Sequence, residues 1–131
     1  MIAIKEFYLF PEDVYRMGNS NTPRMSAIRK DEVSLIVING VTVVVANNKG
    51  VSVWTKEGVI DKGLTGYAWL IKGGSAIPFG LKIVNDTKGH YLLAPAKNMP
   101  LDTYKGLLEE MGMQCIKYLN IKKDGTMVRA G

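Results

Sequence analysis

The stretch Val33-Ser34-Leu35-Ile36-Val37-Ile38-Asn39-Gly40-Val41-Thr42-Val43-Val44-Val45-Ala46 carries the clearest structural signal in this chain. Two runs rich in β-branched residues flank the pair Asn39-Gly40, which suits a type I′ turn with both central residues at positive φ. The pattern therefore predicts a β-hairpin. Apolar residues on both faces of its strands predict that the hairpin lies at the centre of a sheet rather than at an edge.

Strand signals continue on both sides of this hairpin. A turn at residues 47–50 leads into residues 51–54, which predicts a three-stranded meander. Residues 55–66 are polar with three glycines and predict a loop. The remaining strands are expected at residues 7–10, 14–17, 67–71, 81–84 and 90–93, and in a final hairpin over 114–123 and 126–129 turned by Asp124-Gly125.

One helix is predicted directly after Pro100. Apolar residues recur there at helical spacing, and Gly112 occupies the position that follows a helix end; the apolar residues are Leu101, Tyr104, Leu107, Leu108 and Met111. Pro100 suits the first turn because its missing N–H is not needed there. One helix among many strands predicts an α+β fold with a mostly antiparallel sheet, in a single domain spanning residues 1–131.

Composition narrows the classes of function. The chain has 131 residues, a net charge of +5 and a pI near 9.3, which favours an anionic ligand or partner without choosing between a dinucleotide, a nucleic acid and an acidic protein. Cys115 is the only cysteine and His90 the only histidine, so no metal site is expected. A Cys–His nucleophilic pair is discounted because lone cysteines are more often buried than reactive.

The N-terminal residues do not show the pattern of a signal peptide. Residues 1–6 lack a basic region followed by an apolar stretch, and the longest apolar run, residues 33–46, is too short to span a bilayer. The sequence therefore predicts a cytoplasmic protein, and any delivery into a target cell would use a route without a cleavable signal.

The stretch Val14-Tyr15-Arg16-Met17-Gly18-Asn19-Ser20-Asn21-Thr22-Pro23-Arg24 is a candidate phosphate site. Guanidinium groups match phosphate oxygens two at a time, and short Gly/Asn/Ser loops expose backbone N–H groups to the same anions. The alternative is an ordinary surface turn with two solvated arginines. Taken alone, these residues favour the surface turn.

Four segments together resemble one family: residues 14–24, Gly50-Val51-Ser52, Ile77-Pro78-Phe79-Gly80-Leu81, and the run from Gly89-His90-Tyr91 through Ala94-Pro95-Ala96 to Met99-Pro100-Leu101. The family is that of the small ADP-ribosyltransferase-fold toxins related to the second effector of a type VI secretion system. The similarity runs, with gaps, from about residue 7 to about residue 111.

The resemblance implies an antibacterial toxin, a glycosyltransferase that uses NAD as its substrate. It also implies a cognate immunity protein or antitoxin and a macromolecular target in the cytoplasm, either protein or nucleic acid. Carried over residue by residue, the catalytic roles fall on Arg16, which would hold the NAD phosphate or ribose, and on Ser52, which would shape the nicotinamide pocket. Further NAD contacts would come from Asn19, Arg24, His90 and Tyr91, although His90 also fits a packing or hydrogen-bonding strand residue.

The catalytic acid is not assigned by this resemblance. No glutamate belongs to the Gln/Glu-x-Glu pair of the arginine-serine-glutamate class; the glutamates are Glu6, Glu12, Glu32, Glu57, Glu109 and Glu110. The histidine-tyrosine-glutamate class places its histidine on the first strand, where this chain has Arg16. Binding of NAD without turnover therefore stays open.

Two other readings compete. A non-enzymatic basic module could bind nucleic acid through stacking aromatics, with Trp54, Tyr67, Trp69 and Tyr91 as candidates, although the basic residues are scattered. The chain could also be an inhibitor or structural interaction protein, for which it offers nothing specific beyond loops.

Overall fold

The computed structural model describes residues 5–131, which form two antiparallel sheets and two helices. The elements in chain order are β1 (Lys5–Phe7), β2 (Val14–Gly18), β3 (Leu35–Ile38), β4 (Val41–Val44), β5 (Val51–Trp54), α1 (Lys56–Lys62), β6 (Gly66–Ile71), β7 (Leu81–Thr87), β8 (His90–Pro95), β9 (Met99–Pro100), α2 (Leu101–Gly112), β10 (Ile116–Ile121) and β11 (Met127–Arg129). The predicted α+β fold with a mostly antiparallel sheet is confirmed.

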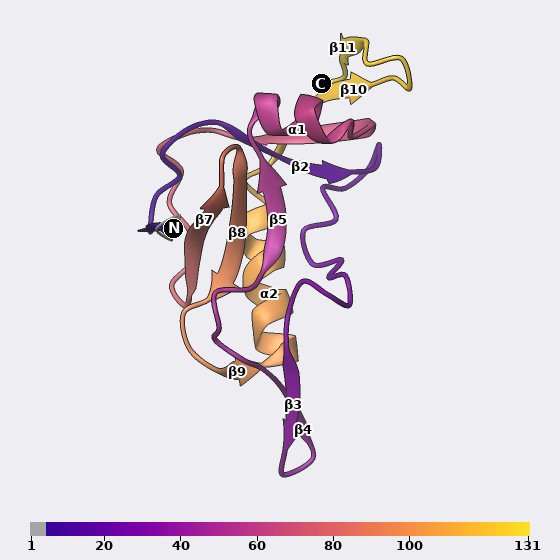
Figure 1. Ribbon diagram of the computed structural model, residues 1–131. Coiled ribbons are helices and arrows are strands. Elements are labelled where there is room, and N and C mark those ends of the chain that lie inside the picture. The colour runs from indigo at the N-terminus through magenta and orange to yellow at the C-terminus, as the bar shows by residue number, and fades with distance from the viewer. Residues whose placement is uncertain (1–4) are drawn as a thin grey trace.

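The larger sheet has eight strands in the order β1-β7-β8-β5-β2-β6-β10-β11. Its two halves join through a single residue pair, Tyr15 on β2 with Trp54 on β5. Figure 1 shows β5, β7 and β8 running side by side, with β2 directed across one end of them. Because the strands diverge after that one pair, the backbone ladder leaves a gap between β2 and β5.

Two apolar clusters cover the sheet. Against the β5–β7–β8 half, α2 buries Tyr104, Leu108 and Met111, which pack with residues such as Val53 and Leu93. On the other half, Val59 of α1 packs with residues of β2, β6 and β10. The cluster under α2 also includes Val14 of β2 and Ile71 of β6, so the two halves of the sheet share it on either side of the gap.

The helix predicted after Pro100 is confirmed, with a small difference at its end. Gly112 is the last helical residue, and Met113 takes the C-cap position in right-handed helical geometry. The Tyr104 hydroxyl donates to the Leu93 carbonyl and accepts from the Val51 N–H, so α2 is fixed to two strands of the sheet.

The loop predicted over residues 55–66 is wrong, because this segment contains α1. Thr55 caps the helix by accepting a hydrogen bond from the Gly58 N–H, and Gly63 ends it in the left-handed conformation, with φ of 65°. The helix is too short for an apolar stripe, so Val59 alone supplies its buried apolar side chain. Capping and one buried contact decide this helix, and periodicity could not reveal it.

The hairpin over β3 and β4 exists as predicted, with Asn39 and Gly40 at φ of 50° and 79°. Its central position and the three-stranded meander are wrong. The hairpin belongs to a separate sheet of order β3-β4-β9, while β5 pairs with β8 and β2. Only its base is buried, through Val43 and Val44, because the rest extends beyond the body of the protein.

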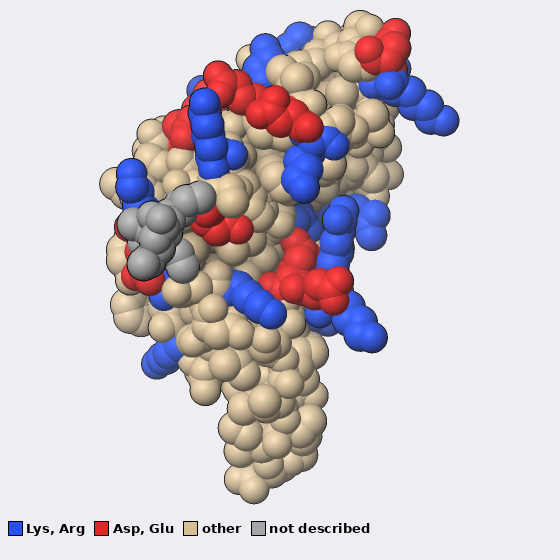
Figure 2. Space-filling model, in the orientation of Figure 1, with Lys and Arg blue, Asp and Glu red and all other residues tan. Residues whose placement is uncertain are grey.

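The exposed part of the hairpin is apolar and uncharged. Figure 2 shows it as a lobe without Lys, Arg, Asp or Glu on the visible face. The β3 side chains are exposed on both faces, up to 70% for Val37.

No helix among residues 5–131 is long and apolar enough to cross a membrane.

Candidate functional site

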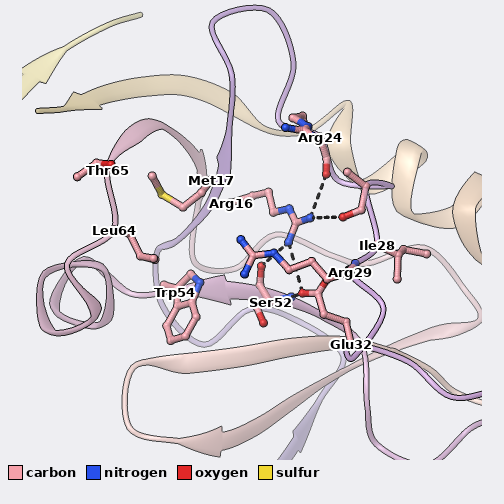
Figure 3. Close-up of a pocket in the computed structure, with 11 residues that line it drawn as sticks. Arg16, Met17, Arg24, Ile28, Arg29, Glu32, Ser52, Trp54, Leu64 and Thr65 are labelled. Carbon is pink, nitrogen blue, oxygen red and sulfur yellow. Dashed lines mark hydrogen bonds and ion pairs between the residues drawn. The ribbon is translucent and has the colours of Figure 1, made fainter. Parts of the chain in front are cut away.

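A cavity of about 340 Å³ opens where β2 and β5 separate. Four segments supply its walls: β2, the connection between β2 and β3, β5, and the turn after α1 (Figure 3). The lining residues are Arg16, Met17, Arg24, Ala27, Ile28, Arg29, Glu32, Ser52, Trp54, Leu64 and Thr65. The structure thus brings the predicted site residues Arg16, Arg24 and Ser52 to one cavity.

Arg16 is buried and spans the gap between the two strands. Its Nη1 donates to the Ser52 carbonyl oxygen at 2.9 Å, and its Nη2 donates to the carbonyl oxygens of Arg24 and Ala27, both at 3.0 Å. Its Nε is buried and has no partner within the described residues. Burial lowers the pKa of Arg16, and the nearby Glu32 carboxylate opposes that shift. Arg16 therefore ties the β2–β3 connection to β5.

Glu32 is the one carboxylate in the cavity wall among residues 5–131. Its Oε2 accepts a hydrogen bond from the Ser52 N–H at 2.9 Å, and its Oε1 accepts from the Arg29 N–H at 2.8 Å. The same Oε2 lies 3.9 Å from Arg16 Nη1, and the side chain is 12% exposed. No local motif marks Glu32, because its position depends on the β2–β3 connection folding back over β5.

Two exposed arginines stand at the rim of the cavity. Arg24 and Arg29 both contribute to the lining, and neither guanidinium takes part in an ion pair within the described part of the chain. The Arg24 backbone lies in the left-handed region, with φ of 52°, and its N–H donates to the Thr22 hydroxyl at 3.1 Å. The rim thus presents two cations above a wall that contains one anion.

Ser52 belongs to a chain of hydrogen bonds that leads away from the cavity. Its Oγ lies 2.9 Å from His90 Nε2, and His90 Nδ1 lies 2.7 Å from Asp86 Oδ1. The Trp54 ring stacks on the imidazole, with ring centroids 4.0 Å apart and an interplanar angle of 28°. Sequence reasoning named Ser52 and His90 but missed Asp86, which stands on the neighbouring strand β7.

The model of the Tse2 ADP-ribosyltransferase toxin family matches residues 12–118. The chain belongs to this family. The match includes every residue that lines the cavity, and it confirms the family expected from the sequence. No curated protein sequence matches the chain.

Three of the NAD contacts expected for a Tse2-family protein lie outside the cavity wall: His90, which contacts Ser52 from behind it, Asn19 and Tyr91. The Asn19 side chain accepts hydrogen bonds from the N–H groups of Asn21 and Thr22, both at 2.8 Å, and so closes the turn after β2. Tyr91 points to the opposite face of β8, where its buried hydroxyl donates to Glu12 Oε2 at 2.6 Å. Burial and this Glu12 contact raise the pKa of Tyr91. The assignment of Asn19 and Tyr91 to NAD stays a prediction.

Cys115 does not line the cavity of this Tse2-family protein. Both ring nitrogens of His90 already contact Asp86 and Ser52. Burial raises the pKa of the Cys115 thiol to about 12, which disfavours the nucleophilic thiolate. Within residues 5–131, no group of three or more His, Cys, Asp or Glu side chains could hold a metal ion.

Proposed function

We propose that the cavity binds NAD and that the protein is an NAD-dependent ADP-ribosyltransferase toxin. It acts in the bacterial cytoplasm on a macromolecule, protein or nucleic acid, and a cognate immunity protein or antitoxin neutralises it. Family membership supports the activity class. The observation that carries the site is the placement of Glu32 beside Ser52 in a wall whose rim bears Arg24 and Arg29.

The charges of the cavity suit cleavage of the nicotinamide–ribose bond. That reaction passes through an oxocarbenium-like state, as glycoside cleavage does, while nicotinamide departs as a neutral group. The enzyme must clamp the pyrophosphate and stabilise positive charge on the ribose. Arg24 and Arg29 have exposed guanidinium groups for the pyrophosphate, and Glu32 supplies the negative charge for the ribose.

Arg16 supports this site mainly as an anchor. Three carbonyl oxygens occupy its Nη groups, so its contacts position the wall segment that carries Arg24. Its Nε is buried and has no partner within residues 5–131. In this proposal, Arg16 shapes the phosphate-binding rim, and the exposed arginines make the ionic contacts.

The cavity is large enough for part of a dinucleotide. Its volume of about 340 Å³ lies in the range of about 300–1,000 Å³ that is typical of ligand pockets.

The alternative function, nucleic-acid binding, required exposed aromatic side chains that stack on bases. Two of the four candidates are occupied within the protein, because Tyr91 is buried and Trp54 is stacked on His90.

The test is nicotinamide release and NAD binding by the purified protein, wild type against Glu32→Gln. We expect Glu32→Gln to keep NAD binding within about threefold and to lower release by at least about a hundredfold, because the neutral amide no longer stabilises the positive ribose. Glu57→Gln, in the first turn of α1, is the matched control and should behave as wild type. Wild-type protein that does not bind NAD at millimolar concentration would rule the proposal out.

Growth arrest provides the cellular counterpart. Expression in the cytoplasm of bacteria that lack the immunity partner should stop growth, and Glu32→Gln should relieve the arrest at equal protein level. Persistent arrest by that variant would show that toxicity does not depend on the carboxylate in the cavity.

A further inference from the structure

We propose that the hairpin of β3 and β4 anchors the protein on an anionic lipid surface, with Phe79 as a second apolar contact. The hairpin projects from the body of the protein, and its visible surface carries no charged side chain (Figures 1 and 2). None of its strand residues lines the cavity. Binding to lipid is therefore independent of the proposed reaction with NAD.

The hairpin presents apolar side chains on both of its faces. Because side chains alternate along a strand, Leu35 and Val37 lie on one face of β3 and Ile36 and Ile38 on the other. Their exposed fractions run from 42% to 70%. In β4 the only polar side chain is that of Thr42. A protein that packs on one face leaves the other in water, whereas the apolar part of a lipid layer covers both.

A second copy of the chain does not fit the hairpin as well as lipid does. Within residues 5–131, β3 pairs with β4 alone, so its outer edge is open. Pairing of two such edges would satisfy backbone groups but would leave both faces of the combined sheet in water. Two copies, each with a net charge of +5, would also repel one another.

The base of the hairpin is basic. Along residues 30–49 the exposed charged side chains are Lys30, Asp31 and Lys49, two cations and one anion. Lys97 joins them, because its neighbour Asn98 accepts a hydrogen bond from the Ala46 N–H at 2.7 Å. Lys30, Lys49 and Lys97 form no ion pair within the described part of the chain. An apolar projection with cations at its base suits a lipid layer with anionic headgroups.

Phe79 adds an aromatic side chain at the same end of the molecule. It is 98% exposed and lines a groove of about 420 Å³ together with Tyr8 and Lys97. It precedes β7, which begins where β8 ends, and the chain then leads through β9 to its pairing with β4 (Figure 1). Aromatic side chains favour the boundary between lipid and water. The groove and the hairpin can thus meet one lipid surface.

The backbone of the hairpin sets the depth of insertion. The four residues of β3 extend over about 13 Å at the usual rise of a strand. Its open edge and the turn at Asn39 and Gly40 have polar backbone groups that need water, which the hydrocarbon core does not supply. The tip therefore enters by about 5–10 Å, to the boundary between headgroups and acyl chains.

Sedimentation with vesicles tests the binding. Wild-type protein should bind vesicles that contain phosphatidylglycerol and phosphatidylcholine in equal amounts, and bind phosphatidylcholine alone at least about tenfold more weakly. Val37→Asp should lower affinity for the anionic vesicles by at least about tenfold, because a carboxylate resists entry into the acyl boundary. The matched control is Val128→Asp on β11, 46% exposed and at the opposite end of the molecule, which should bind like wild type.

The basic and aromatic contributions are measured in the same assay. Lys30→Gln and Lys49→Gln should each weaken binding to the anionic vesicles by about fivefold, through the loss of one cation near the headgroups. Lys123→Gln, an exposed position in the turn between β10 and β11, is the control. Phe79→Ser should weaken binding by about tenfold through the loss of apolar contact.

A polarity-sensitive fluorophore tests the insertion. Attached to Val37→Cys in a Cys115→Ser background, it should shift its emission to shorter wavelength with the anionic vesicles, and the same label on Val128→Cys should not. Circular dichroism shows whether each variant is folded. Wild-type protein that does not bind the anionic vesicles, or binding that a folded Val37→Asp leaves unchanged, would overturn the proposal. A stable dimer at the concentration of the vesicle assay that Val37→Asp separates would also overturn it, because the hairpin would then join two copies.

Discussion

Arg16 Nη1 donates a hydrogen bond to the Ser52 carbonyl oxygen at 2.9 Å across the point where β2 and β5 part. Tyr15 and Trp54 form the last backbone pair before this point, so a side chain takes over where the ladder ends. The same guanidinium holds the carbonyl oxygens of Arg24 and Ala27. One arginine therefore keeps the strands together and determines the shape of the cavity between them.

Loss of the Arg16 side chain should destabilise the fold. We expect Arg16→Ala to cost about 3 kcal/mol, because three partly buried carbonyl groups lose a charged donor. This loss should lower Tm by about 10 °C in thermal unfolding. Arg24→Ala, which removes an exposed side chain, should change stability by no more than about 0.5 kcal/mol. Equal Tm values for the two variants would contradict the anchoring role. Growth arrest by Arg16→Ala must be measured at a temperature where that variant is folded.

The rim arginines should govern affinity for the dinucleotide. Arg24→Gln and Arg29→Gln should each weaken NAD binding by about tenfold, because each removes one ionic contact to the pyrophosphate worth about 1–2 kcal/mol. The effect should shrink at high salt, as screening weakens exposed ion pairs. Calorimetric titration measures both quantities. Lys105→Gln, an exposed position on α2, is the control; if it lowered affinity as much, general surface charge would explain the binding.

The hairpin of β3 and β4 should tolerate charge on its exposed part and not at its base. Val37→Lys, at a position that is 70% exposed, should leave the free energy of unfolding within about 0.5 kcal/mol and reduce self-association in light scattering. Val44→Ala, at a fully buried position, should cost about 2 kcal/mol through lost burial and a residual cavity. A large loss of stability in Val37→Lys would mean that the hairpin is covered in solution.

Cys115 should react slowly while the protein is folded. With a pKa raised from 9.0 to about 12 by burial, about one thiol in 10⁴ is ionised at pH 8, against about one in ten at the ordinary value. Alkylation by iodoacetamide should therefore be at least a hundredfold slower in the native protein than in guanidinium. Comparable rates in the two conditions would show that the thiol is not shielded.

Stability should fall at alkaline pH. Burial raises the pKa values of Tyr91 and Tyr104 above those in the unfolded chain, so their protonated forms stabilise the fold. This contribution is complete below about pH 9 and is lost as pH rises through and beyond the ordinary tyrosine pKa of about 10. Near-ultraviolet absorbance should show these tyrosines ionising together with unfolding. Their ionisation in a still folded protein, as judged by circular dichroism, would contradict the inference.

Local signals in the sequence were sufficient for the hairpins and for α2. Asn39-Gly40 and Asp124-Gly125 both turn hairpins, and the spacing of Tyr104, Leu108 and Met111 marks the buried side of α2. These features depend on backbone preferences and on periodicity within one element, which a single stretch of chain contains. The motif segments likewise indicated the family that the comparison shows.

The residues of the candidate site were also only partly predictable from the sequence. Arg16, Arg24 and Ser52 were named from the sequence, and the fold places them on one cavity. Glu32 and Asp86 were not assigned, because a loop that folds back brings the first to Ser52 and a bulge brings the second to His90. Neither arrangement leaves a pattern of residue types at fixed spacing.

The sequence by itself determined the strand-rich fold class, the turns, the second helix and the family. The tertiary structure alone decided that the apolar hairpin lies outside the main sheet, that β2 and β5 separate after one pair, and that Arg16 bridges the resulting gap. The reason is physical: turns and helices arise from interactions between near neighbours, whereas partners far apart in the chain are selected by the packing of the whole protein.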